Sequence, residues 1–296
     1  MILSSIYVYP IKSLKGISVP SAKVEERGLE LDRRWMLTTP DGMFFTQREF
    51  PRMATISTSV KGDGLLVMSP DVGELSIPFE PDRGERQQVT VWQSVCEGLV
   101  YKGAVSEWFA DVLKTKCQLV YMPDKTKRHI NPRFDRGEDI VSFADGYPLM
   151  VIGEESLNDL NSRLRENHDH NREVADLADF EPLPMNRFRP NLVISGSDPY
   201  AEDGWRTIRI GEAMFHSTKP CERCVITTIE QSTGEFEGKE PLKMLATYRQ
   251  AKILMPDRFE TLGVGANAVL FGQNLVGESV GSRVSVGDTV DVLEIF

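Results

Sequence analysis

The stretch Lys-Pro-Cys-Glu-Arg-Cys-Val-Ile-Thr-Thr-Ile, residues 219–229, places two thiols three residues apart, directly before a β-branched run. Because β-branched residues favour strands, this pattern predicts a strand over 225–229, with Cys224 at or near its start and Cys221 in the preceding turn. A thiolate at Cys224 is suited to binding a soft metal or to nucleophilic chemistry, and the neighbouring Arg223 favours its charged form. The stretch therefore marks a candidate chemical centre.

Four interpretations of this cysteine pair stay open on spacing alone. In the first, the pair is half of a zinc site, although zinc usually takes four ligands and only His216 lies close in sequence. In the second, it is a thioredoxin-like redox pair, although that motif opens a helix and a strand is expected here. In the third, both are buried structural thiols. In the fourth, one sulfur alone is the thiolate ligand of a metal.

Composition describes a globular protein with an acidic surface. The chain has 296 residues, a length that suits one large domain or two ordinary ones. Of these residues, 41% are hydrophobic and 26% are charged. A formal net charge of -10 argues against a nucleic-acid partner. It leaves room for a local basic pocket that binds a small anion.

The same features predict a cytoplasmic location without a membrane partner. Residues 1–9 carry no basic segment and are expected to form a first strand instead of a signal peptide. No apolar run approaches the roughly 18–20 residues that cross a bilayer. Four cysteines are too few for a disulfide scaffold and favour a reducing compartment.

Short strands separated by Gly, Pro and Asp dominate the predicted secondary structure, which indicates an α+β, predominantly β fold of barrel or sandwich type. Apolar spacing predicts two helices, at 106–113 and 154–164. The polar segment 166–183 is expected to be an exposed loop, partly helical near 174–177, and 283–290 to be a closing hairpin. Strands are predicted at 2–8, 34–39, 53–60, 65–68, 88–92, 118–122, 191–194, 207–210, 213–215, 225–229 and 289–293.

Basic and acidic residues at turns are candidates for ligand contacts. Most Lys and Arg side chains are simply solvated, and this is the ordinary explanation for Lys12 and Arg33. The segment 188–191 differs, because Pro190 stiffens a loop that carries an arginine and an asparagine, a geometry suited to bidentate phosphate binding. Asp145 lies at the apex of a turn and either forms an Asx-turn or contacts a bound heterocycle.

Six dispersed motifs together resemble a known family. The chain resembles MOSC-domain proteins with a MOSC N-terminal β-barrel-like module, the group that includes bacterial YcbX-like proteins and the mitochondrial amidoxime-reducing component. The resemblance covers nearly the whole chain. The motifs are Tyr-Pro-Ile-Lys-Ser at 9–13, Asp-Arg-Arg-Trp at 32–35, Ser-Phe-Ala-Asp-Gly-Tyr-Pro at 142–148, Phe-Arg-Pro-Asn at 188–191, Cys-Glu-Arg-Cys followed by Thr-Thr at 221–228, and Phe-Gly-Gln-Asn at 271–274.

The resemblance implies an N-terminal β-rich MOSC module over 1–122 and a MOSC β-barrel domain with a few short helices over 123–296. It implies a molybdenum-molybdopterin cofactor between them, with Cys224 as the metal ligand and catalytic residue and with Arg223 keeping that ligand deprotonated. The other implied cofactor contacts are Lys12, Ser13, Arg33, Asp145, Gly146, Tyr147, Arg189, Asn191, Glu222, Arg223 and Asn274.

The implied activity is that of a molybdenum-dependent oxidoreductase that reduces N-hydroxylated compounds, such as hydroxylamines, amidoximes and N-hydroxylated nucleobases, to amines. Many bacterial relatives carry a ferredoxin-like domain with four clustered cysteines, and no such cluster occurs up to Phe296. Electrons are therefore expected from a separate partner, a flavin reductase or a ferredoxin-type protein. The alternative is a module that carries the cofactor or sulfur, with Cys224 holding a persulfide, without reductase turnover.

Overall fold

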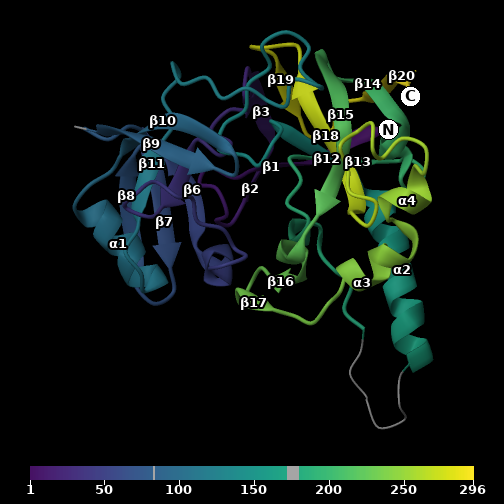
Figure 1. Ribbon diagram of the computed structural model, residues 1–296, viewed down its shortest axis with the longest axis horizontal. Coiled ribbons are helices and arrows are strands. Elements are labelled where there is room, and N and C mark those ends of the chain that lie inside the picture. Colours follow the sequence, from purple (N-terminus) through teal and green to yellow (C-terminus); the bar gives the residue numbers. More distant parts are fainter. Residues whose placement is uncertain (83, 172–179) are drawn as a thin grey trace.

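The computed structural model describes residues 1–82, 84–171 and 180–296, and strands predominate in it (Figure 1). This confirms the predicted α+β, mainly β fold class. The largest sheet has eight strands. In spatial order they are β2 (Ile17–Val19), β1 (Ile2–Val8), β13 (Leu192–Ser195), β12 (Leu149–Gly153), β18 (Val269–Gly277), β15 (Ala213–Arg223), β14 (Trp205–Ile210) and β20 (Val290–Ile295).

The expected barrel does not close through these strands. The sheet has two ends, at β2 and β20, and β1 meets the start of β20 through a bridge between Ile2 and Thr289 and through backbone hydrogen bonds between residues 1–3 and 287–290. Because β1 and β2 lie in this sheet, the first residues of the chain pair with strands formed almost two hundred residues later. The division at residue 122 stays a prediction.

The other sheets are smaller. A four-stranded and a three-stranded sheet lie together on the left of Figure 1, beside helix α1. The four-stranded sheet consists of β5 (Trp35–Thr38), β11 (Gln118–Tyr121), β10 (Ser94–Val100) and β9 (Glu85–Val91). One three-stranded sheet consists of β6 (Ser57–Lys61), β7 (Gly64–Ser69) and β8 (Gly73–Pro78), and the other of β19 (Arg283–Ser285), β3 (Ser21–Glu25) and β4 (Gly28–Leu29). The two-stranded sheet consists of β16 (Ile229–Glu230) and β17 (Glu235–Phe236).

The α-helices of the described residues are α1 (Ala104–Leu113), α2 (Glu154–Asn171), α3 (Leu242–Tyr248) and α4 (Ala251–Leu254). Both predicted helices are present as α1 and α2. Helix α1 buries Trp108, Phe109, Val112 and Leu113, the four apolar residues whose spacing predicted it. Four short 3-10 helices, η1 (Pro51–Thr55), η2 (Met185–Arg187), η3 (Ala201–Gly204) and η4 (Val225–Thr228), join strands.

Strand β12 is buried along its whole length because both of its faces are covered. Leu149 and Val151 point into the main core, whereas Met150 and Ile152 pack against the apolar side of α2. Helix α2 then leads to β13, which pairs with β12 in parallel. This crossover places the residues just before β13 beside the start of β12, where the candidate site lies.

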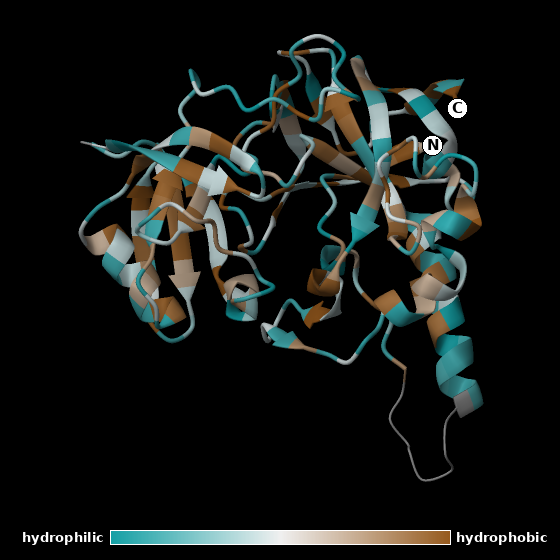
Figure 2. Cartoon of the chain, viewed as in Figure 1, coloured by the Kyte–Doolittle hydropathy of each residue, from teal (hydrophilic) through white to brown (hydrophobic). Residues whose placement is uncertain are grey.

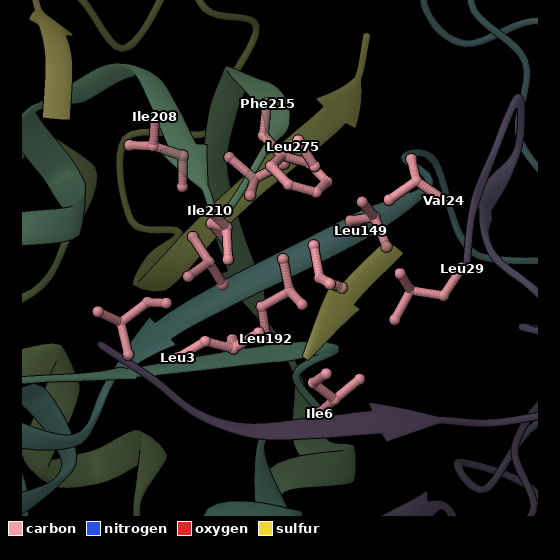
Figure 3. Close-up of a cluster of buried hydrophobic side chains, with 14 of the residues drawn as sticks. Leu3, Ile6, Val24, Leu29, Leu149, Leu192, Ile208, Ile210, Phe215 and Leu275 are labelled. Atoms are coloured by element: carbon pink, nitrogen blue, oxygen red, sulfur yellow. The ribbon is translucent and has the colours of Figure 1, made fainter. Parts of the chain in front are cut away.

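The main core gathers side chains from strands far apart in sequence. Figure 3 shows Leu3 and Ile6 of β1 facing Leu192 of β13 and Ile210 of β14. Val24 belongs to the same cluster, so β3 also contributes to it. The segments next to Leu149 and Leu192, which form part of the cavity described below, are therefore anchored in this core.

Three predicted strands are wrong in extent. The strand expected at 213–215 continues to Arg223 as β15, so Cys221 lies in this strand and not in the expected turn. Residues 225–228 form η4, and the strand ends before Cys224, at Arg223. The hydroxyl of Thr227 donates to the Cys224 carbonyl at 3.0 Å and that of Thr228 to the Val225 carbonyl at 2.8 Å, so local bonds displace the strand. Within 53–60, Pro51 starts η1 and strand β6 begins only at Ser57.

Two predicted connections also differ. The segment 283–290 is not a hairpin, because β19 pairs with β3 and β20 with β14, although the expected turn is present. Helix α2 continues through Asn171, so the first part of the predicted loop 166–183 is helical, and its outer end is hydrophilic (Figure 2). The partial helix expected near 174–177 lies outside the described residues.

Candidate functional site

One cavity, of about 170 Å³, gathers every residue that the resemblance assigned to the cofactor or the metal. It is lined by segments far apart in the sequence: the turn after β1, the residues that precede β5 and β12, those that follow η2, and the end of β15 with the residues after it. The predicted residues that line it are Lys12, Ser13, Arg33, Asp145, Gly146, Tyr147, Arg189, Asn191, Glu222, Arg223, Cys224 and Asn274. Their roles as ligands stay predictions, but their placement around one cavity is a property of the fold.

The turn after β1 holds its polar residues in a constrained backbone. Ile11 and Leu14 are fully buried and anchor it on both sides. Between them Ser13 has a φ of 67°, and its carbonyl accepts a hydrogen bond from the Gln47 side chain at 2.7 Å. Left-handed backbone is unfavourable for residues other than Gly, so the surrounding contacts must hold it.

Two arginines of the cavity share this backbone strain. Arg33 has a φ of 50° and Arg189 a φ of 53°. Both guanidinium groups lie 4.3 Å from the ring centroid of Tyr9, whose hydroxyl donates to the Pro190 carbonyl at 3.0 Å. Burial raises the pKa of Tyr9 to about 12, so the ring stays neutral and serves as a platform for both cations.

We call Lys12, Arg33 and Arg189 the cation wall. Lys12 forms an ion pair with Asp145, and Arg33 Nη1 lies 2.5 Å from Asp32 Oδ2. Within the part of the chain that the structure describes, the Arg189 side chain has no hydrogen bond or ion pair. Burial, followed by the nearby Arg33 charge, lowers the pKa of Arg189 to about 10. An anion in the cavity would relieve this uncompensated charge.

Asn191 positions the cation wall instead of pointing freely into the cavity. Its side-chain oxygen accepts a hydrogen bond from Arg33 Nη1 at 3.0 Å and one from the Met150 amide at 3.3 Å. Its amide nitrogen donates to the Tyr7 carbonyl at 3.1 Å. With only 1% of Asn191 exposed, the geometry indicates that it orients Arg33.

Arg128 fixes the loop that carries Asp145, Gly146 and Tyr147. Its guanidinium donates to the carbonyls of Ser142 at 2.8 Å, Ala144 at 2.6 Å and Asp145 at 2.7 Å. The side chain is buried, and burial lowers its pKa. An arginine with its donors directed at three carbonyls of one turn holds the loop in one conformation.

We call Arg48, Cys221, Arg223 and Cys224 the sulfur wall. Arg48 Nη2 lies 3.0 Å from the Cys224 sulfur. Arg223 Nη1 lies 3.0 Å from the Cys221 sulfur and its Nη2 donates to the Phe188 carbonyl at 2.6 Å. Each sulfur therefore has its own guanidinium.

Arg223 was expected to act on the sulfur of Cys224, but its guanidinium contacts the sulfur of Cys221 instead. Successive residues of an extended chain point to opposite faces, so Arg223 shares its face with Cys221 and not with Cys224. Burial raises the pKa of the Cys221 thiol, and Arg223 partly offsets this rise. The cation beside Cys224 is Arg48.

Sequence reasoning missed Arg48 and Arg128, because neither lies in a recognised motif or a regular element. Arg48 follows Thr46, whose hydroxyl accepts a hydrogen bond from the Arg48 amide at 3.1 Å. A hydroxyl two residues before an arginine is a weak signal of a tight turn. Asp32 was quoted within a motif but not assigned a role, and its full burial beside Arg33 gives it one.

The interpretations of the cysteine pair now differ in support. The described residues contain no group of three or more His, Cys, Asp or Glu side chains placed to hold a metal, so the zinc interpretation lacks a ligand set there. Cys221 lies inside β15, not at the start of a helix as in a thioredoxin-like pair. Both sulfurs line the cavity and are only half-buried, which disfavours purely structural thiols.

The cavity fits an anionic ligand with a soft metal. Arg189 lacks an anionic partner, and Arg223 Nε is buried without a hydrogen-bond partner among the described residues. A phosphate-bearing group matches the first feature, and the half-buried sulfur of Cys224 suits a soft metal.

Comparison with known proteins places the chain in a family. Residues 1–116 match the MOSC N-terminal beta barrel domain and residues 138–291 match the MOSC domain. The chain belongs to the MOSC-domain family. The family resemblance inferred from the six motifs is thereby confirmed.

Three relatives with informative names are similar over almost the whole chain. The "Mitochondrial amidoxime-reducing component 1" of Homo sapiens is 32% identical over 304 residues, 98% of this chain and 82% of the relative. The "Mitochondrial amidoxime reducing component 2" of Homo sapiens is 30% identical over 97% of this chain and 82% of the relative. The "Molybdenum cofactor sulfurase" of Oryza sativa subsp. japonica is 35% identical over 94% of this MOSC chain, which spans only 35% of that relative's length.

Among the described residues of this MOSC-family chain, no helix combines the length and the apolar character that crossing a bilayer requires.

Proposed function

We propose that this chain holds a molybdenum-pterin cofactor and reduces N-hydroxylated compounds to amines. The observation that carries the proposal is that one cavity of a MOSC-family protein joins a half-buried thiol pair to a cation wall in which Arg189 lacks an anionic partner among the described residues. The names of the amidoxime-reducing relatives support the reaction class. The cytoplasmic location expected from cysteine content remains part of the proposal, supported by four free cysteines.

The residues present divide the work of binding. Arg189 and Arg33 would take the phosphate of the pterin, with Ser13 at the adjacent turn, because their strained backbones already direct them into the cavity. Cys224 would ligate the metal. The metal, when bound, would supply the two-electron redox chemistry of the reaction.

The net reaction is R–NHOH + 2 e⁻ + 2 H⁺ → R–NH₂ + H₂O, in which the N–O bond breaks and the oxygen leaves as water. A separate flavin reductase or ferredoxin-type protein would supply the electrons. Lys12 and Arg48 both line the cavity and are placed to donate hydrogen bonds to an oxygen-bearing substrate group. Asp145, paired with Lys12, would orient that donor.

Metal analysis and turnover test this proposal together. Protein purified from a host that makes the cofactor should contain stoichiometric molybdenum by elemental analysis. With dithionite as the donor, it should convert benzamidoxime to benzamidine. Purified protein without molybdenum, or loaded protein without turnover, would contradict the reductase proposal.

The likeness to a sulfurase relative favours one second candidate, a cofactor or sulfur carrier. In that case Cys224 would hold a persulfide, and Arg48 at 3.0 Å would stabilise its terminal charge. Mass spectrometry of freshly purified protein distinguishes the two, because a persulfide adds one sulfur atom to the peptide that contains Cys224. Release of cofactor or sulfur without benzamidoxime reduction would support the carrier.

A further inference from the structure

A second hollow adjoins the cavity and has a different character. It is about 450 Å³ in volume and shares Thr46 and Arg48 with the cofactor cavity. Its lining is rich in aromatic and apolar side chains. These are Met43, Phe44, Phe45, Phe50 and Trp92. Arg48 is therefore the partition between a sulfur-lined cavity and an aromatic groove.

Trp92 is the unusual member of this groove. It occupies the two-residue connection between β9 and β10 with a φ of 55°, a conformation in which Gly or Asn is favoured and a bulky aromatic is strained. Core packing does not hold Trp92 in this conformation, because 44% of the residue is exposed. The other three tryptophans of the chain, Trp35, Trp108 and Trp205, are buried. Burial in the core therefore does not explain a tryptophan here.

The contacts of Trp92 all lead to the site. The Arg48 guanidinium lies 4.7 Å from the Trp92 ring centroid, and the same guanidinium lies 3.0 Å from the Cys224 sulfur. A hydrogen bond from Trp92 also contributes to lowering the pKa of Asp145. Phe44 meets the Trp92 ring edge-on, with centroids 5.0 Å apart, and Lys12 Nζ lies 5.6 Å from the Phe44 ring centroid. The Arg48 guanidinium thus lies in contact with both the Trp92 ring and the Cys224 sulfur.

We propose that Phe44, Arg48 and Trp92 form an aromatic subsite that selects substrates whose N-hydroxylated group is attached to a planar ring. A substrate with its N–O bond beside Cys224 would extend past Arg48, where a planar ring can stack on the exposed part of Trp92. Base–aromatic and guanidinium stacking tolerate many ring types, which suits aryl amidoximes and N-hydroxylated nucleobases alike. This inference rests on the proposed function and narrows its substrate class.

The test compares Trp92→Leu with Trp92→Phe, which keeps a stacking ring. Two probes differ only in the ring: benzamidoxime carries a phenyl group and acetamidoxime a methyl group. Trp92→Leu should lower the ratio of kcat/KM for benzamidoxime over acetamidoxime about 5- to 30-fold, mainly through KM. Trp92→Phe should retain most of the ratio. Phe236→Leu, at an exposed aromatic residue of β17 outside both hollows, should leave it unchanged.

Two further measurements make the outcome independent of turnover and of the donor protein. Ligand-observed NMR on cofactor-free protein should show benzamidoxime binding that weakens by a similar factor in Trp92→Leu. If wild-type protein reduces neither compound, the proposed function fails, and the NMR titration still decides the subsite. If both compounds are reduced and Trp92→Leu changes neither ratio nor affinity by more than about twofold, the subsite is overturned while the function stands. A loss seen only with a protein donor, and absent with dithionite, assigns Trp92 to donor docking and also overturns the subsite.

Discussion

The two walls of the cavity compensate their charges in different ways. On the cation wall, Arg33 and Lys12 have carboxylate partners, Asp32 and Asp145, whereas Arg189 has none among the described residues. On the sulfur wall, Arg48 and Arg223 face sulfur atoms and carbonyls, with one guanidinium for each thiol. The difference indicates that the cation wall has one positive charge that a bound anion would neutralise. On the sulfur wall, each guanidinium already contacts a thiol.

The largest expected effect tests whether the two sulfurs are equivalent. Cys224→Ala should abolish both molybdenum retention and benzamidoxime turnover, because it removes the proposed metal ligand. Cys221→Ala should leave substantial metal, since that sulfur is engaged by Arg223 on the other face of the chain. Elemental analysis and circular dichroism on both variants check metal content and folding. Equal loss of metal from two folded variants would end the single-ligand assignment.

The next effect tests whether the cation wall is unsatisfied without a ligand. Arg189→Met should weaken cofactor retention about 10- to 150-fold, the equivalent of a charge-assisted contact. The free energy of unfolding of the cofactor-free variant should be at least as high as that of wild type, because a half-buried charge without an anionic partner is removed.

Urea unfolding and cofactor release rates measure the two quantities. Arg209→Met is the matched control, since Arg209 Nη2 forms an exposed ion pair with Asp291 Oδ2 at 2.6 Å outside the cavity. Reduced stability together with unchanged cofactor retention would show that Arg189 serves the fold and not the ligand.

The smallest effect concerns the Lys12–Asp145 pair. Burial alone would raise the pKa of Asp145, but the Lys12 ammonium and its hydrogen bond hold that pKa well below its usual range. Its stabilising contribution is therefore complete above the ordinary carboxyl pKa of about 3.9, and it is lost as pH falls through the lower folded value. Because 58% of the Asp145 side chain is exposed, solvent screens the pair and the effect is modest.

Asp145→Asn in cofactor-free protein checks this pair. The difference in unfolding free energy between wild type and variant should be constant at neutral pH and shrink below about pH 4. Urea unfolding from pH 3 to pH 8 measures it. Asp291→Asn, an exposed ion-pair partner elsewhere, is the control. A difference that grows on acidification would reverse the sign and refute the assigned pairing.

Regular elements were predictable where apolar spacing is strong. The alternation in β1 and the helical spacing of Trp108, Phe109 and Val112 each indicate one structure, and packing agrees with both. The strand expected at 225–229 failed because the Thr227 and Thr228 hydroxyls satisfy backbone carbonyls locally. A β-branched composition alone therefore does not distinguish a strand from a 3-10 helix.

The cavity residues were foreseen from motifs, but their pairings were not. Alternation in an extended segment already implies that Arg223 faces Cys221, and this signal was hidden by the assumption of a turn. The partner of Cys224 depends on a tertiary contact across 176 residues, which no local pattern encodes. Arg48 could therefore be found only in the folded chain.

The pairing of β1 with β13 also determines when, during synthesis, the main sheet can form. Ile2 of the first strand aligns with Ser195, so the nascent chain emerges with that strand edge unsatisfied. At ordinary translation rates the delay is on the order of ten to forty seconds. Until then β2 can shield only the opposite edge, between Ile6 and Val19. Ribosome-bound intermediates of this protein should accordingly recruit chaperones early and be able to bind the proposed cofactor only after synthesis is nearly finished.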